Sequence, residues 1–355
     1  MIDNIREARL NFELLKEIGQ EGKNSEVFLS HDKQLDGNIA VKRIQKSKFK
    51  EPAHFFEEAK KLYDSNHPNI VHVKYSCQDD NYIYIAMPFY ANGSLNNVID
   101  SRFLSTREIV KYSLDFLSGL HHIHTKKLLH FDIKPNNILL SNSMGGLLSD
   151  FGLAKYIDSY GTAEPDNLYL AQAPPERYLT DRFTVHSDIY QAGVTIYRLC
   201  NGNKEFYSQR NAFYNEDGTY NFSRFQKAVL SGRFPDRTIF LPHIPGKLRT
   251  IVRKAMKPNP SERYDSVIEM MNDLATIDEK LDWMHSIGHD FYEWTIEFDS
   301  KFETIRIQSN GDTFDVEGRK NIKLSGRITR IKDWTKNNLE KQNALDFVKE
   351  ILDIY

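Results

Sequence analysis

Two polar strings, each beside a short apolar run, constrain this chain of 355 residues more than any other feature. HFDIKPNN at residues 130–137 precedes the apolar ILL of residues 138–140, and DFG at residues 150–152 follows the apolar GLL of residues 146–148. Short apolar runs bounded by turn residues predict buried strands. Two loops that border buried strands can present two carboxylates to one cleft.

Phosphoryl transfer needs this combination of groups: oxygen ligands for Mg²⁺, an acceptor for the proton of the nucleophile, and positive charge beside the phosphoryl group. Asp132, with Lys134 two and Asn137 five residues later, precedes Asp150 by eighteen residues. Either aspartate alone would be interpreted as a turn or cap residue. Together, in this order and at this interval, the two strings predict a site of phosphoryl transfer.

The two strings and their surroundings resemble the eukaryotic-like Ser/Thr protein kinases, over about residues 12–281. The fold of that family is a small β-rich lobe hinged to a larger helical lobe. The resemblance implies that Asp132 is the catalytic base and that Lys134 lies near the γ-phosphate of ATP. It further implies that Asn137 and Asp150 are ligands of Mg²⁺.

The residues before these strings extend the resemblance. IAVK at residues 39–42 is similar to the strand whose lysine holds the α- and β-phosphates in this family. Glu58 follows Lys42 by sixteen residues, on a segment with helical spacing, and resembles the glutamate that orients that lysine. Glu57 is the alternative, although a solvated helix position suits it better. An ion pair between Lys42 and Glu58 would mark the active arrangement.

IGQEGKNSEV at residues 18–27 stands where the family keeps its glycine-rich phosphate loop. Glycine allows backbone N–H groups to approach phosphates closely. This copy departs from the pattern, because Ser25 replaces the last glycine and one extra residue separates Gly19 from Val27. A simple hairpin turn at Gly19 and Gly22 is the alternative. The resemblance implies that the nucleotide contacts Ile18, Gly19, Gly22, Ser25, Val27, Ala40 and Lys42.

MPFY at residues 87–90 resembles the hinge between the lobes, with Met87 at the back of the adenine pocket. The adenine contacts of the family use the carbonyl of residue 88 and the N–H of residue 90. Proline lacks only its N–H, so Pro88 and Tyr90 can both make these contacts.

Three further matches are structural. Glu176 ends APPE at residues 173–176, which resembles the end of the activation segment, and Asp188 lies in the helix that follows. Arg263 stands where the family places the arginine that pairs with Glu176. We interpret these residues as scaffold, because a buried carboxylate–guanidinium pair supports the fold.

Two positions break the family pattern. Phe131 replaces the arginine that receives an activation-loop phosphate in many relatives, so we expect activity without phosphorylation of this loop. The hydroxyls concerned are those of Ser159, Tyr160, Thr162 and Tyr169. Tyr169 also stands seven residues before Glu176, where Ser/Thr-specific relatives tend to have a threonine that packs against the catalytic loop. Lys134 still favours Ser/Thr specificity.

After about residue 281 the pattern changes to alternating apolar residues, which predicts strands. Asn310 and Gly311, between two of these runs, predict a hairpin, and the residues from Leu345 to Leu352 predict a closing amphipathic helix. Residues 319–341 carry eight basic and two acidic side chains, whereas residues 283–318 carry two basic and eight acidic ones. This module could bind an anionic partner or dock on the kinase domain. A solvated surface of mixed charge is the alternative, and no nucleic-acid motif is present.

Composition bears on the partners and the location that we expect for this protein. The formal net charge is −2, from 47 basic and 49 acidic residues, so no basic nucleic-acid coat dominates the chain. Two cysteines, Cys77 and Cys200, cannot form a disulfide framework and suit a reducing compartment. The charged first ten residues do not resemble a signal peptide, and no apolar run approaches the roughly 20 residues of a membrane span. We therefore expect a cytoplasmic protein without a membrane partner.

The sequence predicts an α+β, bilobal kinase fold with an N-lobe at residues 1–90, a C-lobe at residues 91–281 and a small α+β module at residues 282–355. The predicted activity is Mg-ATP-dependent phosphorylation of Ser or Thr in protein substrates, the chain itself included. A pseudokinase or ATP-binding scaffold that organises partners through the module is the first alternative. A small-molecule kinase of related fold is the second, although the activation segment and Arg263 argue against it.

Overall fold

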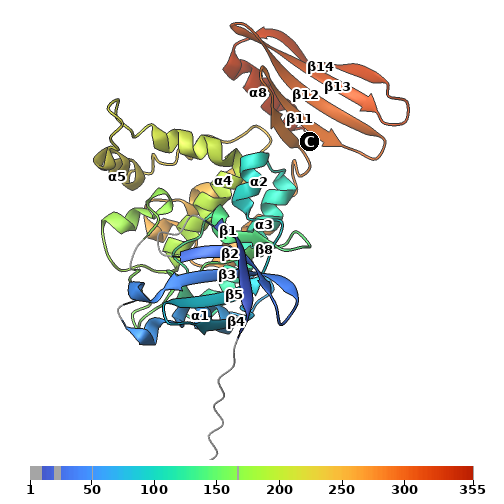
Figure 1. Cartoon of the computed structure of the whole chain (residues 1–355). Helices are drawn as coiled ribbons and strands as arrows, with labels where there is room; N and C mark the ends of the chain where they lie inside the picture. The colour runs from blue at the N-terminus through green and yellow to red at the C-terminus, as the bar shows by residue number, and fades with distance from the viewer. Residues whose placement is uncertain (1–9, 20–24, 50, 166–167, 355) are drawn as a thin grey trace, which may run out of the picture.

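A computed structural model of the chain describes residues 10–19, 25–49, 51–165 and 168–354. A β-rich lobe, a helical lobe and a separate sheet with one helix follow one another along the chain (Figure 1). The expected bilobal α+β fold with a small α+β appendage is therefore confirmed. The residue boundaries of the three expected parts stay predictions.

The first lobe is built on a five-stranded antiparallel sheet in the order β1-β2-β3-β5-β4. The helix of this lobe packs Ala59 against Ile83 and Ile85 of the sheet, whereas its Leu62 belongs to the core of the helical lobe. One helix on a small sheet is what the apolar spacing predicts. The elements are β1 (Phe12–Gly19), β2 (Ser25–Asp32), β3 (Gly37–Gln45), α1 (Glu57–Asp64), β4 (Tyr75–Gln78) and β5 (Tyr82–Pro88).

The second lobe is a helical bundle around the buried faces of two long helices, α3 and α4. A capping box at Ser105 and Glu108 starts α3, because each residue bonds the backbone N–H of the other. Gly202, at φ 78°, interrupts the helical backbone of α4. The helices are α2 (Leu95–Ser101), α3 (Thr106–Thr125), α4 (Val185–Asn211), α5 (Phe222–Leu230), α6 (Gly246–Ala255) and α7 (Val267–Ala275).

Short strands carry the two polar strings. β7 (Ile138–Leu140) pairs antiparallel with β8 (Gly146–Leu148), so the residues just before β7 and just after β8 lie at one end of the hairpin. β6 (Leu128–Leu129) pairs with β9 (Lys155–Tyr156). The 3-10 turns are η1 (Lys46–Lys48), η2 (Pro52–His54), η3 (Pro135–Asn137), η4 (Leu170–Gln172), η5 (Pro175–Tyr178) and η6 (Pro260–Glu262).

The C-terminal module is a five-stranded antiparallel meander with a helix against one face. The predicted hairpin is present, since Asn310 pairs with Thr313 across Gly311 at φ 71°. All three tryptophans of the chain, Trp283, Trp294 and Trp334, lie in the core of this module. The elements are β10 (Met284–Ile287), β11 (Phe291–Glu297), β12 (Lys301–Asn310), β13 (Thr313–Ile322), β14 (Ile328–Leu339) and α8 (Lys341–Leu352).

The module lies beside the helical lobe, at the opposite end of the molecule from the first sheet (Figure 1). Arg107 of α3 forms an ion pair with Asp282, with 2.6 Å between Nε and Oδ1. The ring of His285 lies 4.7 Å from that of Phe103, centroid to centroid. Lys280, whose side chain is 4 % exposed, forms an ion pair with Asp353 after α8. These contacts join the module to the helical lobe, and the role of the module stays a prediction.

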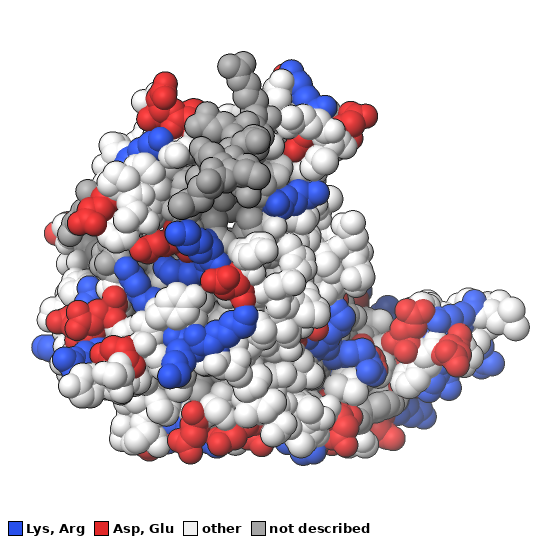
Figure 2. Space-filling view, turned by 90° about the horizontal axis from the view of Figure 1, so that it is seen from below, with Lys and Arg blue, Asp and Glu red and all other residues white. Residues whose placement is uncertain are grey.

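Five of the eight basic residues between 319 and 341 have a side-chain contact within the module itself, among them Arg330, whose Nε donates to Oγ1 of Thr335 at 3.4 Å. Arg319 and Lys323 form ion pairs with Glu317 and Glu297, and the ammonium groups of Lys336 and Lys341 lie over the rings of Phe347 and Tyr292. Basic and acidic side chains are also interspersed on the face of the molecule in Figure 2. These contacts favour the interpretation of the basic segment as a surface of mixed charge. In the described part of the chain, no helix is long and apolar enough to span a membrane.

Candidate active site

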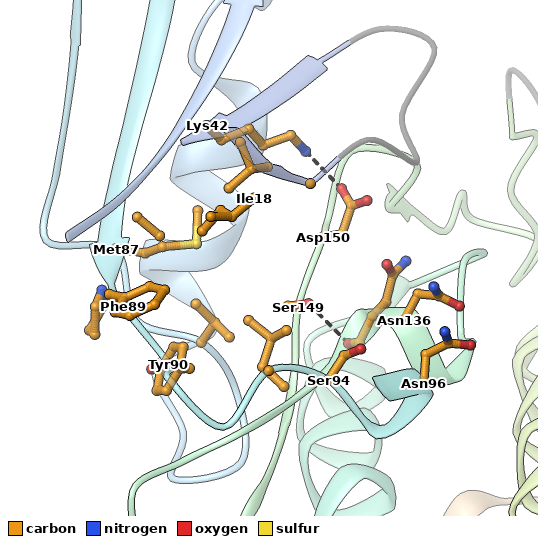
Figure 3. A pocket seen from close by; sticks show the side chains of 18 of the residues that line it. Ile18, Lys42, Met87, Phe89, Tyr90, Ser94, Asn96, Asn136, Ser149 and Asp150 are labelled. Atoms are coloured by element: carbon orange, nitrogen blue, oxygen red, sulfur yellow. Dashed lines mark hydrogen bonds and ion pairs between the residues drawn. The ribbon is translucent and has the colours of Figure 1, made fainter. Parts of the chain in front are cut away.

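A cavity of about 750 Å³ opens between the two lobes. Side chains from the first sheet, the connection after β5, the start of α2 and the two polar loops surround it (Figure 3). Among the residues expected to contact a nucleotide, Gly22 lies outside the described residues. The others line this cavity: Ile18, Gly19, Ser25, Val27, Ala40, Lys42, Met87, Pro88 and Tyr90.

Lys42 of β3 joins the two lobes at the inner end of this cavity. Its side chain is buried, and Nζ lies 2.6 Å from Oε1 of Glu58 on α1 and 2.7 Å from Oδ1 of Asp150 after β8. Figure 3 shows Lys42 and Asp150 pointing toward each other. Glu57 instead lies near Lys61, with 3.8 Å between the charged atoms. The structure thus brings together Lys42, Glu58 and Asp150, and leaves Glu57 apart.

Charge and burial act in opposite directions on these three groups. Burial by itself would lower the pKa of the Lys42 amine, but the carboxylates of Asp150 and Glu58 raise that pKa above its ordinary value. Burial would also raise the pKa of Asp150, but the Lys42 ammonium outweighs burial and lowers this pKa to about 2. For Glu58 burial prevails, so its pKa lies above the ordinary 4.5. Asp150 is therefore the more firmly ionised carboxyl group.

The loop between β6 and β7 gathers the other polar residues. Oδ2 of Asp132 accepts hydrogen bonds from Nζ of Lys134 at 3.0 Å and from Nδ2 of Asn137 at 2.7 Å. Asn137 uses the same nitrogen to bond the backbone carbonyl of Asp132 at 2.9 Å. Its amide oxygen is therefore the atom that could bind a metal. Lys134, Asn137 and Asp150 all line the cavity.

Asp188 of α4 stabilises the conformation of this loop. Its carboxylate accepts hydrogen bonds from the backbone N–H groups of His130 and Phe131, both at 2.8 Å, and contacts His124 at the same distance. Phe131 has φ 67°, a left-handed conformation that is unusual for a residue with a side chain. The buried carboxylate thus stabilises a strained turn directly before Asp132.

Oxygen donors face the cavity where a divalent cation would be expected. Asn137 and Asp150 offer an amide and a carboxylate oxygen, the hard ligands that Mg²⁺ prefers. In the described ranges, no group of three or more His, Cys, Asp or Glu side chains is arranged to hold a metal ion. Two protein ligands suit Mg²⁺, which usually takes its remaining ligands from phosphates and water.

The cavity also contains residues that the sequence analysis did not single out. Ser94 and Asn96 at the start of α2 and Asn136 before β7 line it (Figure 3). They come together because the backbone of Gly93 accepts a hydrogen bond from Leu140 of β7 at 2.9 Å. Asn136 lies inside the first polar string, so its position was a usable signal. Ser94 carries only the sequence signal of a helix cap.

Glu176 and Arg263 form the bidentate pair that the sequence places in the scaffold. The guanidinium donates to the two carboxylate oxygens at 2.9 and 2.7 Å, and the Arg263 side chain is fully buried. Arg263 also donates to the backbone carbonyls of His186, Lys257 and Pro258. The pair thus connects the end of the activation segment to the loop before α7.

Comparison with known proteins gives consistent matches. The model of the protein kinase domain family matches residues 12–274. The probable serine/threonine-protein kinase PknB of Lactococcus lactis is 27% identical over 276 residues, which cover 75% of this chain and 42% of that protein. PrkC of Bacillus subtilis, a serine/threonine-protein kinase, is 27% identical over 75% of this chain and 40% of its own length. Mouse serine/threonine-protein kinase Nek5 is 29% identical over 71% and 38%. The chain thus spans less than half the length of these curated relatives.

Proposed function

This chain belongs to the protein kinase family, and on that premise we propose that it transfers the γ-phosphoryl group of Mg-ATP to Ser or Thr hydroxyls of proteins, its own included. One observation carries the proposal. Lys42 contacts both Glu58 and Asp150, while Asp132, Lys134 and Asn137 form a bonded group beside the same cavity. These charged and polar groups are the kinds that phosphoryl transfer requires, and their proximity supports the proposal.

Each residue takes the role that its position supports. Lys42, oriented by Glu58, would neutralise charge on the α- and β-phosphates. Asp132 would accept the proton of the attacking hydroxyl, and Lys134 would stabilise charge on the transferred phosphoryl group. Asn137 and Asp150 would bind Mg²⁺, which neutralises the phosphate oxygens when bound.

The N–H and carbonyl groups of the connection after β5 would hold the adenine. Pro88 and Tyr90 line the cavity here, and Met87 lies next to them (Figure 3). Ile18, Val27 and Ala40 supply apolar surface on the opposite side. An apolar slot with a few backbone hydrogen-bonding groups suits a flat, polar-edged base.

We further propose that activity does not depend on phosphorylation of the activation loop. Phe131 is buried, and its ring meets that of Phe183 edge to face at 5.9 Å. Ala163 of the activation segment pairs through its backbone with Phe183. Apolar contacts would thus hold the activation segment at the position where the family resemblance implies a contact between a phosphate and an arginine. The cluster comprises Leu129, Phe131, Ala163, Leu168, Ala173 and Phe183.

Transfer of γ-labelled phosphate from Mg-ATP tests the proposal. Purified protein, alone and with a generic basic protein, is compared with an Asp132→Ala variant. We expect label on Ser or Thr with the wild type and none with the variant, and an unchanged rate after phosphatase treatment. Bound ATP without any transfer would favour the scaffold alternative. A loss of rate after phosphatase treatment would contradict only the proposed independence from loop phosphorylation, and the proposed kinase activity would stand.

A further inference from the structure

Lys134 has a second neighbour besides the carboxylate of Asp132. Its ammonium lies 4.9 Å from the centroid of the Tyr169 ring, within the range of a cation–π contact. The side chain of Lys134 is only 12 % exposed, so little water competes for this ammonium. The Tyr169 ring thus forms one wall of the site in which the lysine is held.

The structure attaches Tyr169 to the catalytic loop through the turn that it begins. The carbonyl of Tyr169 accepts the N–H of Gln172 at 3.0 Å, which closes η4. The Gln172 amide then donates to the carbonyl of Ile133, the residue between Asp132 and Lys134, at 3.3 Å. Arg198 of α4 donates to the amide oxygen of Gln172 at 2.9 Å and so fixes its orientation.

The orientation of the ring is itself restrained. Tyr169 is half-buried against the core of the helical lobe. Burial and a hydrogen bond with Tyr207 raise the pKa of Tyr169 to about 12, so the phenol stays protonated and neutral. A neutral, half-buried ring with a fixed face toward Lys134 is a favourable partner for an ammonium.

We propose that Tyr169 is a positioning residue for phosphoryl transfer: its ring holds the Lys134 ammonium against Asp132, at a position where Ser/Thr-specific relatives tend to have a threonine. The proposal rests on the function proposed above. A lysine held between a ring and a carboxylate meets the transferred phosphoryl group in one geometry, without the cost of ordering a flexible side chain during the reaction. The effect should therefore appear in kcat and not in the binding of ATP.

Substitutions at Tyr169 test this role, because they separate the effect of the aromatic ring from the effects of side-chain size and of the hydroxyl group. Tyr169→Phe keeps the ring, and we expect kcat within about twofold of wild type. Tyr169→Leu keeps apolar bulk without a ring, and we expect kcat to fall about two- to thirtyfold with KM for ATP unchanged. Tyr207→Phe is the matched control, because it keeps the Tyr169 ring and removes the hydroxyl that bonds Tyr169 and accepts a 3.4 Å hydrogen bond from Arg198. Equal losses in Tyr169→Phe and Tyr169→Leu, or no loss in either, would overturn the proposal.

A readout that does not need activity separates this proposal from the proposed function. Acylation of lysines by an amine-reactive reagent, quantified peptide by peptide, reports the accessibility of Lys134, with exposed Lys204 as the reference. We expect labelling of Lys134 to rise several-fold in Tyr169→Leu and to stay at the wild-type level in Tyr169→Phe. If Tyr169→Leu does not fold, Tyr169→Met is used in its place. Wild-type protein without transfer would overturn the function, whereas unchanged labelling in the ringless variant would overturn the role of Tyr169.

Discussion

At the scale of single residues, the site depends on one ammonium shared by two carboxylates of unequal acidity. Lys42 contacts Glu58 and Asp150 at nearly equal distances, but burial raises the pKa of Glu58 while Lys42 lowers that of Asp150 to about 2. On acidification Glu58 is therefore protonated first. The contact of Lys42 with Glu58, within the first lobe, is therefore weakened before the contact of Lys42 with Asp150, which joins the two lobes.

This order predicts a loss of activity at acid pH without a matching loss of stability. The folded-state pKa of Glu58 lies above its ordinary 4.5, so this group favours the folded state more as pH falls. Asp150 has a lowered pKa, and its contribution is complete above 3.8 and lost as pH falls toward 2. We expect kcat/KM to fall on an acid limb above pH 4.5, where protonation of Glu58 by itself raises Tm and Asp150 leaves Tm unchanged.

The pH dependence of kcat/KM and of Tm, measured in the same buffers, checks this expectation. Glu57→Gln is the matched control, because Glu57 lies beside Lys61 and not beside Lys42. Its acid limb should coincide with that of the wild type. An acid limb that follows the thermal unfolding of the protein would contradict the assignment to Glu58.

A second prediction concerns Phe131. Substitution by arginine would place a cation within the apolar cluster around Phe183. We expect Phe131→Arg to lower the free energy of unfolding by about 3–5 kcal/mol, the cost of an uncompensated buried charge. Urea unfolding measures this change. Leu179→Arg, at a side chain that is 73 % exposed, should change it by no more than about 0.5 kcal/mol.

At the scale of elements, the packing of η5 against the loop before α7 depends on the pair of Glu176 and Arg263. Removing Arg263 alone takes the guanidinium from three backbone carbonyls and from the buried Glu176 carboxylate, which keeps the hydroxyl of Ser187 as a donor. We expect Arg263→Ala to cost about 3–5 kcal/mol of unfolding free energy. Replacement of both partners, as Glu176→Leu with Arg263→Met, should cost less, because no charge stays buried. Chemical denaturation of the single and double variants measures the coupling, and additive losses would contradict it.

Secondary structure is also the scale at which the sequence was most informative. The spacing of Ile109, Tyr112, Leu117 and Leu120 predicts the buried face of α3, and all four side chains are buried. Asn310 and Gly311 predict the β12–β13 hairpin for an equally local reason, the left-handed conformation that its turn requires. The kink of α4 at Gly202 could not be predicted from a local pattern in this way, because the residues before it and after it are both helical.

At the scale of the whole molecule, the module and the helical lobe have separate cores. Trp283, Trp294 and Trp334 belong to the core of the module, and the helical lobe has its own cluster around α3 and α4. Tryptophan fluorescence therefore reports the folding of the module alone. We expect its transition in guanidinium chloride to differ from that of catalytic activity, because two cores of this size need not unfold together.

Variants at the contact between the two parts sharpen this test. Lys280 is buried and Arg107 is exposed, so Lys280→Met should shift the fluorescence transition more than Arg107→Gln, whose exposed ion pair is worth at most about 1 kcal/mol. Coincident fluorescence and activity transitions in the wild type would show that the module and the lobe unfold as one unit.

Residue type and spacing along the chain were enough to predict the candidate site and much of the local structure. Charged and amide groups at fixed intervals, from Lys42 to Asp150, predicted the groups that line the cavity, because phosphoryl transfer tolerates few other residue types in those positions. Periods of two and of about 3.6 residues identified strands and helices, because burial of one face is a local requirement.

The neighbours of those groups follow from the packing of the whole molecule. The approach of Ser94 to the cavity, the ring of Tyr169 over Lys134 and the contact of His285 with Phe103 each join segments that no short-range pattern links. The partners of the basic segment were decided in the same way, by strand register and by the position of α8. Such contacts depend on how whole elements pack, and packing is set by the shape and volume of many side chains at once.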